Sequence, residues 1–170
     1  MIDRLPDRLD LLATADAGRV LRGRMKLSAM PRLLPALTSS DGDLQVSLEL
    51  GKDPDGTRYL RGTIQGDVQL QCQRCLEPMT LSLDLGFCLG IVRELEAIHA
   101  LHERYDPVLV SAEPTSLADI ATDEVLLALP LVPAHADNGK CHAFVQDYKP
   151  PQPEKRDGPF AALAELKQKP

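Results

Sequence analysis

The chain has 170 residues, of which 44% are hydrophobic and 4% aromatic, and its formal net charge is -6. This length suits one domain with an appended tail, and a domain of this size buries a core that does not depend on cross-links. The negative charge excludes a protein that wraps nucleic acid by overall charge alone.

The sequence predicts a cytoplasmic protein with reduced thiols. Residues 1–8 contain acids and a proline where a signal peptide needs a basic start and an apolar run. No stretch approaches the roughly 20 apolar residues of a membrane span. The 4 cysteines are too few and too unevenly spaced for the disulfide framework of a small secreted domain.

Charged residues are unevenly distributed along the chain. Residues 4–32 are rich in arginine, whereas in residues 94–124 only Arg104 opposes a series of acids. One surface could therefore meet phosphate and another a basic protein, although both runs also suit ordinary solvated surface.

The first third of the chain predicts three short elements. Residues 9–18 favour a short helical stretch, residues 20–27 a basic strand, and residues 31–37 a brief helix bounded by prolines. Their patterns are short, so long-range contacts must decide their exact form.

The middle of the chain predicts antiparallel strands. Apolar residues alternate with polar ones over 44–50, 60–72 and 80–89, which is typical of half-buried strands, and residues 53–56 have turn chemistry. Glycines at positions 62 and 66 on the apolar face indicate a bend or the close approach of another element. The Cys72-to-Cys75 motif then lies at the tip of a long hairpin.

Helical spacing replaces the alternation after residue 113. Leu117 and Val125 belong to an apolar stripe, Ser116 lies three residues before Asp119 as a helix cap would, and Pro130 ends the pattern. The predicted fold class is α+β, with a mostly antiparallel sheet flanked by helices.

The C-terminal part predicts a tail outside the domain. We expect a single domain over residues 1–148, a proline-rich linker over 149–158, and a short amphipathic helix over 159–170. The apolar stripe of that helix consists of Phe160, Leu163 and Leu166. Such a short helix is marginal alone, so it needs its own domain or a partner to pack against.

Two cysteines separated by two residues can bind a metal, exchange disulfides, or form a structural disulfide. A redox site of the thioredoxin type places its cysteines at the start of a helix, which stabilises the thiolate. Here Pro78 and a strand follow instead. Arg74 would still lower the pKa of a neighbouring thiol, which leaves a thiol-disulfide oxidoreductase as an alternative.

A structural zinc site fits the Cys72–Cys75 pair better. Structural zinc takes four tetrahedral cysteine or histidine ligands and leaves no position for water. The pair supplies two of them, and the irregular stretch after the helix supplies His135 and Cys141, with Cys88 as an alternative fourth ligand. The competing interpretation is a set of reduced cysteines, with Cys72 packed as a small hydrophobe.

No catalytic motif is present in the sequence. GxSxG, HExxH, a P-loop and GxGxxG are all missing. We therefore predict a protein that is not an enzyme, has no small-molecule substrate, and does not associate with membranes.

Three motifs in order resemble one known family. They are the knuckle at residues 72–76 after an alternating strand, the run at residues 123–135 followed by Cys141, and the terminal stretch at residues 159–167. Together they resemble the bacterial YceD family, known as the large ribosomal RNA subunit accumulation protein. The likeness extends over nearly the whole chain.

The resemblance implies a non-enzymatic role in the synthesis, processing or stability of 23S ribosomal RNA. The implied partners are large-subunit ribosomal RNA, ribosomal proteins, or both. Arg22, Arg24 and Arg74 are the candidate phosphate contacts, and the terminal apolar stripe is a candidate partner contact. A zinc-stabilised interaction module outside ribosome assembly remains a further alternative.

Overall fold

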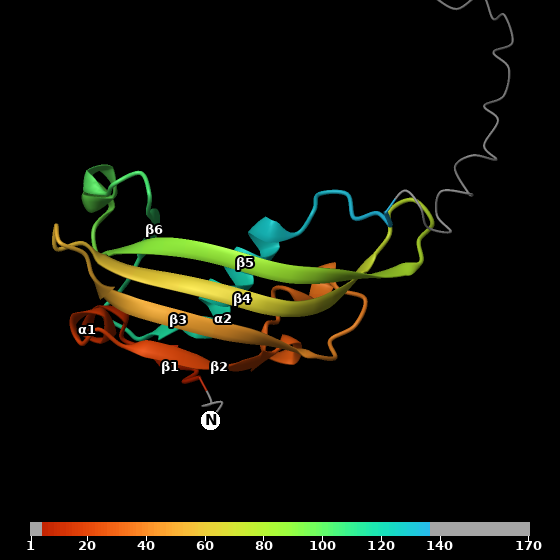
Figure 1. Ribbon diagram of the computed structural model, residues 1–170, viewed down its shortest axis with the longest axis horizontal. Helices are drawn as coiled ribbons and strands as arrows, with labels where there is room; N and C mark the ends of the chain where they lie inside the picture. Colours follow the sequence, from red (N-terminus) through yellow and green to blue (C-terminus); the bar gives the residue numbers. More distant parts are fainter. Residues whose placement is uncertain (1–4, 137–170) are drawn as a thin grey trace, which may run out of the picture. The chain divides into compact units, whose positions relative to one another are not determined.

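The structure is a computed structural model that describes residues 5–136. It confirms the α+β class, with a five-stranded sheet in the order β2-β3-β4-β5-β6 and a two-stranded sheet of β1 and β7 (Figure 1). The elements are β1 (Arg8–Leu9), α1 (Leu11–Asp16), β2 (Val20–Lys26), β3 (Asp43–Lys52), β4 (Arg58–Gln71), β5 (Pro78–Val92), β6 (Asp106–Leu109), β7 (Thr115–Ser116) and α2 (Leu117–Ala128), with 3-10 turns at Leu27–Ala29, Leu34–Ala36 and Leu95–Ala100.

Strands β2 to β5 pair antiparallel with their sequence neighbours, and β6 pairs parallel with β5. The longest pairing joins β4 and β5, from Tyr59 opposite Gly90 to Gln71 opposite Pro78. The six residues that connect these strands, 72–77, contain both cysteines of the CxxC motif.

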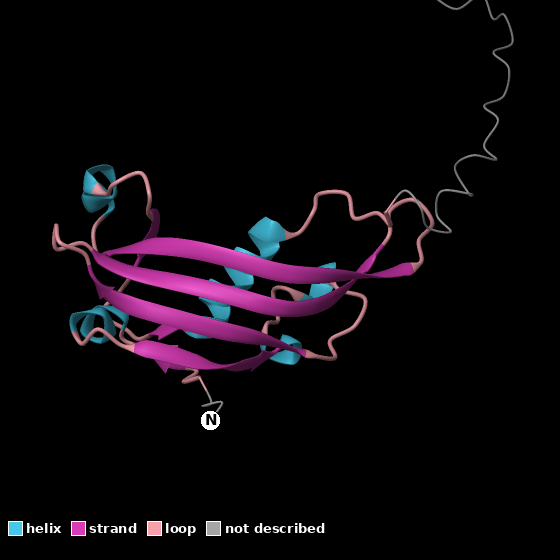
Figure 2. Cartoon of the chain, viewed as in Figure 1, coloured by secondary structure: helices cyan, strands magenta, loops and turns pink. Residues whose placement is uncertain are grey.

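The core lies on one face of the five-stranded sheet. Alternation directs Leu48, Leu60 and Ile64 to this face, where they join Leu117 and Val125 of α2 in one buried cluster. Figure 2 shows α2 crossing behind the strands, with the other face of the sheet in front. That other face is polar, because it carries the alternate residues of the same strands.

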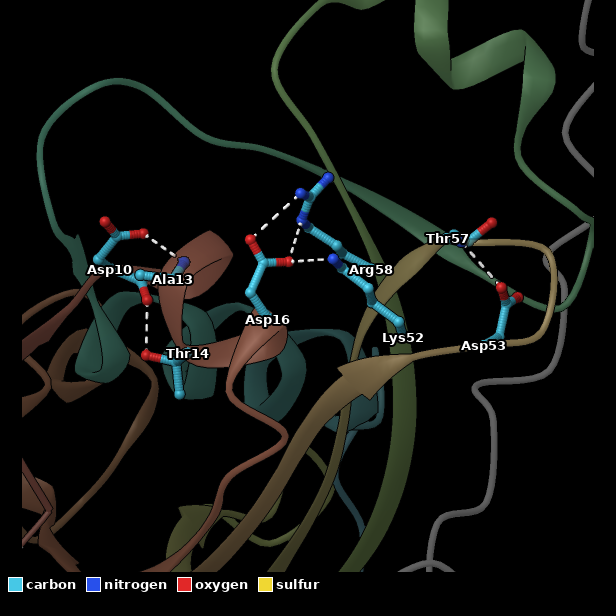
Figure 3. Close-up of polar contacts among 8 residues, drawn as sticks. All are labelled: Asp10, Ala13, Thr14, Asp16, Lys52, Asp53, Thr57 and Arg58. Carbon is cyan, nitrogen blue, oxygen red and sulfur yellow. Dashed lines mark hydrogen bonds and ion pairs between the residues drawn. The ribbon is translucent and has the colours of Figure 1, made fainter.

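Helix α1 is capped and tied to the sheet by side chains. The Asp10 carboxylate accepts a hydrogen bond from the Ala13 N–H at 2.9 Å. At the other end of α1, the Asp16 carboxylate lies 2.8 Å from Lys52 Nζ and 2.7 Å from Arg58 Nε (Figure 3). These ion pairs hold the helix end against the adjacent ends of β3 and β4.

Helix α2 begins and ends where the sequence predicts. The Ser116 hydroxyl accepts a hydrogen bond from the Asp119 N–H at 3.2 Å, and Leu129 leaves the helical conformation before Pro130. In the described part of the chain, no helix is long and apolar enough to cross a membrane.

Some short elements differ from the sequence prediction. The brief helix expected over residues 31–37 is a single 3-10 turn, Leu34–Ala36, since Pro35 lacks the N–H that a continuing helix would use. Strands β1, β6 and β7 were not predicted. The predicted linker 149–158 and helix 159–170 lie outside the described residues.

Candidate metal centre

The connection between β4 and β5 is a tight turn closed by its own backbone. The Leu76 N–H donates to the Cys72 carbonyl at 2.9 Å, and the Cys72 N–H donates to the Glu77 carbonyl at 2.9 Å. Leu76 has a positive φ of 62°, a left-handed conformation that is uncommon for residues other than glycine. The turn brings the Cys72 and Cys75 side chains to one side of the hairpin tip.

A second segment, residues 133–135, lies against this turn. The Gln73 N–H donates to the Pro133 carbonyl at 2.8 Å, and the Arg74 guanidinium donates to the His135 carbonyl. Cys75 Sγ lies 3.4 Å from His135 Nδ1. The chain that leaves α2 is therefore fastened to the hairpin tip by backbone and side-chain contacts.

The three potential ligand atoms of Cys72, Cys75 and His135 all lie within 4.8 Å of one another. In a tetrahedral zinc site, bond lengths of about 2.3 Å to sulfur and 2.0 Å to nitrogen place neighbouring ligand atoms about 3.5 to 3.8 Å apart. The donor set and its spacing therefore fit a zinc ion after a small contraction. The cluster could hold a metal with one ligand position still to be filled.

Cys72 lies in surroundings that favour its thiolate. Its side chain is fully buried. Burial by itself raises the pKa of the thiol, but hydrogen bonds from the backbone N–H groups of Cys75, His135 and Arg74 outweigh this effect and lower the pKa from 9.0 to about 5. The thiolate is the form of cysteine that binds metal, so the turn holds Cys72 ready for coordination.

Burial also weakens the disulfide-exchange alternative. Exchange requires a thiolate to reach a sulfur atom of another molecule, and Cys72 has no accessible surface. The strand β5, not a helix, follows the motif. The structure therefore gives Cys72 the lowered thiol pKa of a redox site without access for a substrate, and only Cys75 of the pair is partly exposed.

The other residues named from the sequence have different positions. Cys88 lies on β5 opposite Arg61 and is not part of the cluster among the described residues. Arg74 lies at the knuckle itself, bonded to the His135 carbonyl. Cys141, Phe160, Leu163 and Leu166 lie outside the described residues. The sequence did not reveal that the Pro133 carbonyl and the N–H donors to Cys72 take part in this site. These are backbone groups, which nearly every residue has, so residue types do not indicate them.

Arg22 and Arg24 lie on the polar face of the sheet, remote in sequence from the knuckle. They share β2, where both are exposed, and line a shallow groove of about 240 Å³. The groove continues across β3 and β4 past Gln45, Thr63 and Gln65. Arg24 also forms an ion pair with Asp43 at 3.6 Å.

Comparison with known proteins identifies the family. The family model described as "Large ribosomal RNA subunit accumulation protein YceD" matches residues 60–167. A protein of that name from Haemophilus influenzae is 32% identical over 171 residues, and the match covers 98% of this chain and 98% of that protein. No solved structure matches the chain. The resemblance seen in the sequence is thereby confirmed, and the chain belongs to the YceD family.

Proposed function

We propose that this protein supports the accumulation of large-subunit ribosomal RNA in the cytoplasm. It acts without catalysing a reaction, by binding 23S ribosomal RNA, ribosomal proteins, or both. Membership of the YceD family supports this role, because the family is named for accumulation of the large ribosomal RNA subunit. The match to a relative covers 98% of both chains, so the likeness extends over nearly all of this sequence.

The open polar face of the sheet carries the proposal of RNA contact. Its arginines are exposed beside hydroxyl and amide side chains, and this combination binds phosphate and sugar groups. The pairing register aligns Arg22 with Ser47 and Thr63, and Arg24 with Gln45 and Gln65. The protein is acidic overall, but the arginines of β2 are close enough together to contact a few phosphates. A small RNA contact of this kind does not require a positive net charge.

Crosslinking of the full-length protein in cells, followed by sequencing of the bound RNA, tests the RNA contact. We expect enrichment of 23S ribosomal RNA, and a loss of most of that enrichment in Arg22→Glu. Arg93→Glu is the matched control, because it makes the same charge change at an exposed residue outside the groove. It should retain the enrichment.

Two results would contradict this proposal. Equal loss in both variants would mean that overall charge, not the polar face, attracts RNA. Unchanged 23S ribosomal RNA in a deletion strain would reject the accumulation role itself. Absence of RNA enrichment together with normal complementation would assign the role to protein contacts alone.

We also propose that the knuckle binds a structural zinc ion. Cys72, Cys75 and His135 supply three ligands of the types that zinc takes, and Cys141 is the proposed fourth. Four protein ligands would close the site to water, so the ion would fasten the hairpin tip to the chain that follows α2. This role agrees with a protein that works through its surfaces.

A further inference from the structure

Large apolar side chains are exposed in succession at the end of α2 and just beyond it. Leu127 is 82% exposed, Leu131 fully so, and Val132 67%. Isolated exposed leucines are normal on protein surfaces, whereas a run of them in one short segment indicates an interaction site.

This exposed segment is fixed at both ends. At its start, the Leu129 N–H donates to the Val125 carbonyl at 3.1 Å, and Val125 is fully buried in the core. At its end, the Pro133 carbonyl accepts from the Gln73 N–H at 2.8 Å at the hairpin tip. Figure 1 shows the segment running from α2 to the tip of the β4–β5 hairpin. Because the backbone is anchored at both ends, the apolar side chains stay exposed in a fixed arrangement, and a partner would have little ordering cost to overcome on binding.

The charged side chains of α2 itself are all acidic. Helix α2 contains Asp119, Asp123 and Glu124 and has no lysine or arginine in its sequence. Asp123 forms an ion pair with Arg32 at 2.7 Å. Burial raises the pKa of Glu124, and the neighbouring carboxylates of Asp106 and Asp123 raise it further. A cation brought by a partner would relieve this repulsion, whereas a phosphate would increase it.

We propose that residues 123–132 form a docking surface for a basic protein segment that carries apolar side chains. The apolar part would bury Leu127, Leu131 and Val132, and the basic part would face Glu124. This inference rests on the function proposed above, under which the partner is a large-subunit ribosomal protein. The surface differs from the polar sheet face, whose groove is lined by Arg22 and Arg24 and lies on β2 to β4.

Binding of full-length protein to a panel of purified large-subunit ribosomal proteins tests this surface. We expect at least one member to bind, and Leu131→Asp to weaken that binding at least about tenfold, as loss of a buried apolar contact at an interface does. Val20→Asp is the matched control: Val20 is also exposed, at 55%, but lies on β2. It should bind as the wild type does.

The inference is overturned if no member of the panel binds, or if Leu131→Asp and Val20→Asp behave alike. Self-association of the wild type that Leu131→Asp abolishes would also overturn it, because the occupant would then be a second copy. Expression in a deletion strain separates the two proposals. If Leu131→Asp restores 23S ribosomal RNA as fully as wild type, the docking surface is wrong and the accumulation role stands.

Discussion

Gly62 lies where the Phe87 ring crosses from the neighbouring strand. The two residues are paired between β4 and β5, and a Cβ atom on Gly62 would lie only 2.0 Å from Phe87 Cζ. A glycine is needed here for space, because the ring occupies the volume that a side chain would fill. The two glycines in the sequence pattern of β4 predicted such a close approach, although they did not identify the ring.

We expect Gly62→Ala to lower the free energy of unfolding by about 1 to 3 kcal/mol, since the added methyl displaces a partly buried ring. Gly86 provides the control in the adjacent register position, opposite Thr63. A Cβ atom there meets nothing within 4 Å, so Gly86→Ala should be neutral or stabilising by up to about 1 kcal/mol. Urea unfolding of both variants measures the difference. Equal changes in the free energy of unfolding for the two variants would show that the Phe87 ring does not require a glycine at position 62.

At the scale of elements, the Asp16 carboxylate joins three of them. It links α1 to Lys52 of β3 and Arg58 of β4 (Figure 3). The hydrogen bond from Arg58 and then that from Lys52 lower the pKa of Asp16 from 3.8 to about 2. Because the folded state has the lower pKa, these contacts stabilise the fold above pH 4 and are lost as the pH falls toward 2.

We expect Asp16→Asn to lower the melting temperature at pH 7 by roughly 1 to 4 °C, a small effect because these charges are partly exposed. The difference from wild type should shrink between pH 4 and pH 2, where the wild-type carboxylate becomes protonated. Asp41→Asn is the control, since Asp41 forms no ion pair within residues 5–136. A melting-temperature difference that stays constant down to pH 2 would show that the ionised Asp16 carboxylate is not the source of the stabilisation.

Long elements could be predicted from the sequence, whereas short ones could not. Strands β3, β4 and β5 each extend over enough residues to show an alternating pattern, and α2 shows both a helical stripe and a cap. Strand β1 has only two residues, and its structure depends on pairing with β7 more than a hundred positions away. Asp53 similarly accepts hydrogen bonds from Arg104 and Tyr105, a contact that no local pattern indicates.

At the scale of the whole molecule, the candidate metal centre lies outside the large buried apolar cluster. The buried apolar cluster on the inner face of the sheet does not include Cys72. The cysteine spacing and the turn context predicted which thiols lie together, and the irregular stretch after α2 pointed to His135. The contacts that align this stretch with the hairpin tip are hydrogen bonds from the Gln73 N–H and the Arg74 guanidinium to the backbone carbonyls of Pro133 and His135, which only the folded chain reveals.

If the candidate site binds zinc as proposed, this separation would make loss of the metal a local event. We expect purified full-length protein to contain about one zinc per chain, as four ligands hold one ion. Cys72→Ser should lose the zinc, whereas Cys88→Ser should keep it, because Cys88 lies on β5 outside the ligand cluster. Elemental analysis measures the metal. In Cys72→Ser, amide exchange should accelerate at Gln73 and Leu76 yet remain slow in the β3–β4 pairing. Zinc retained by Cys72→Ser, or exchange that accelerates throughout the sheet, would contradict a local metal anchor.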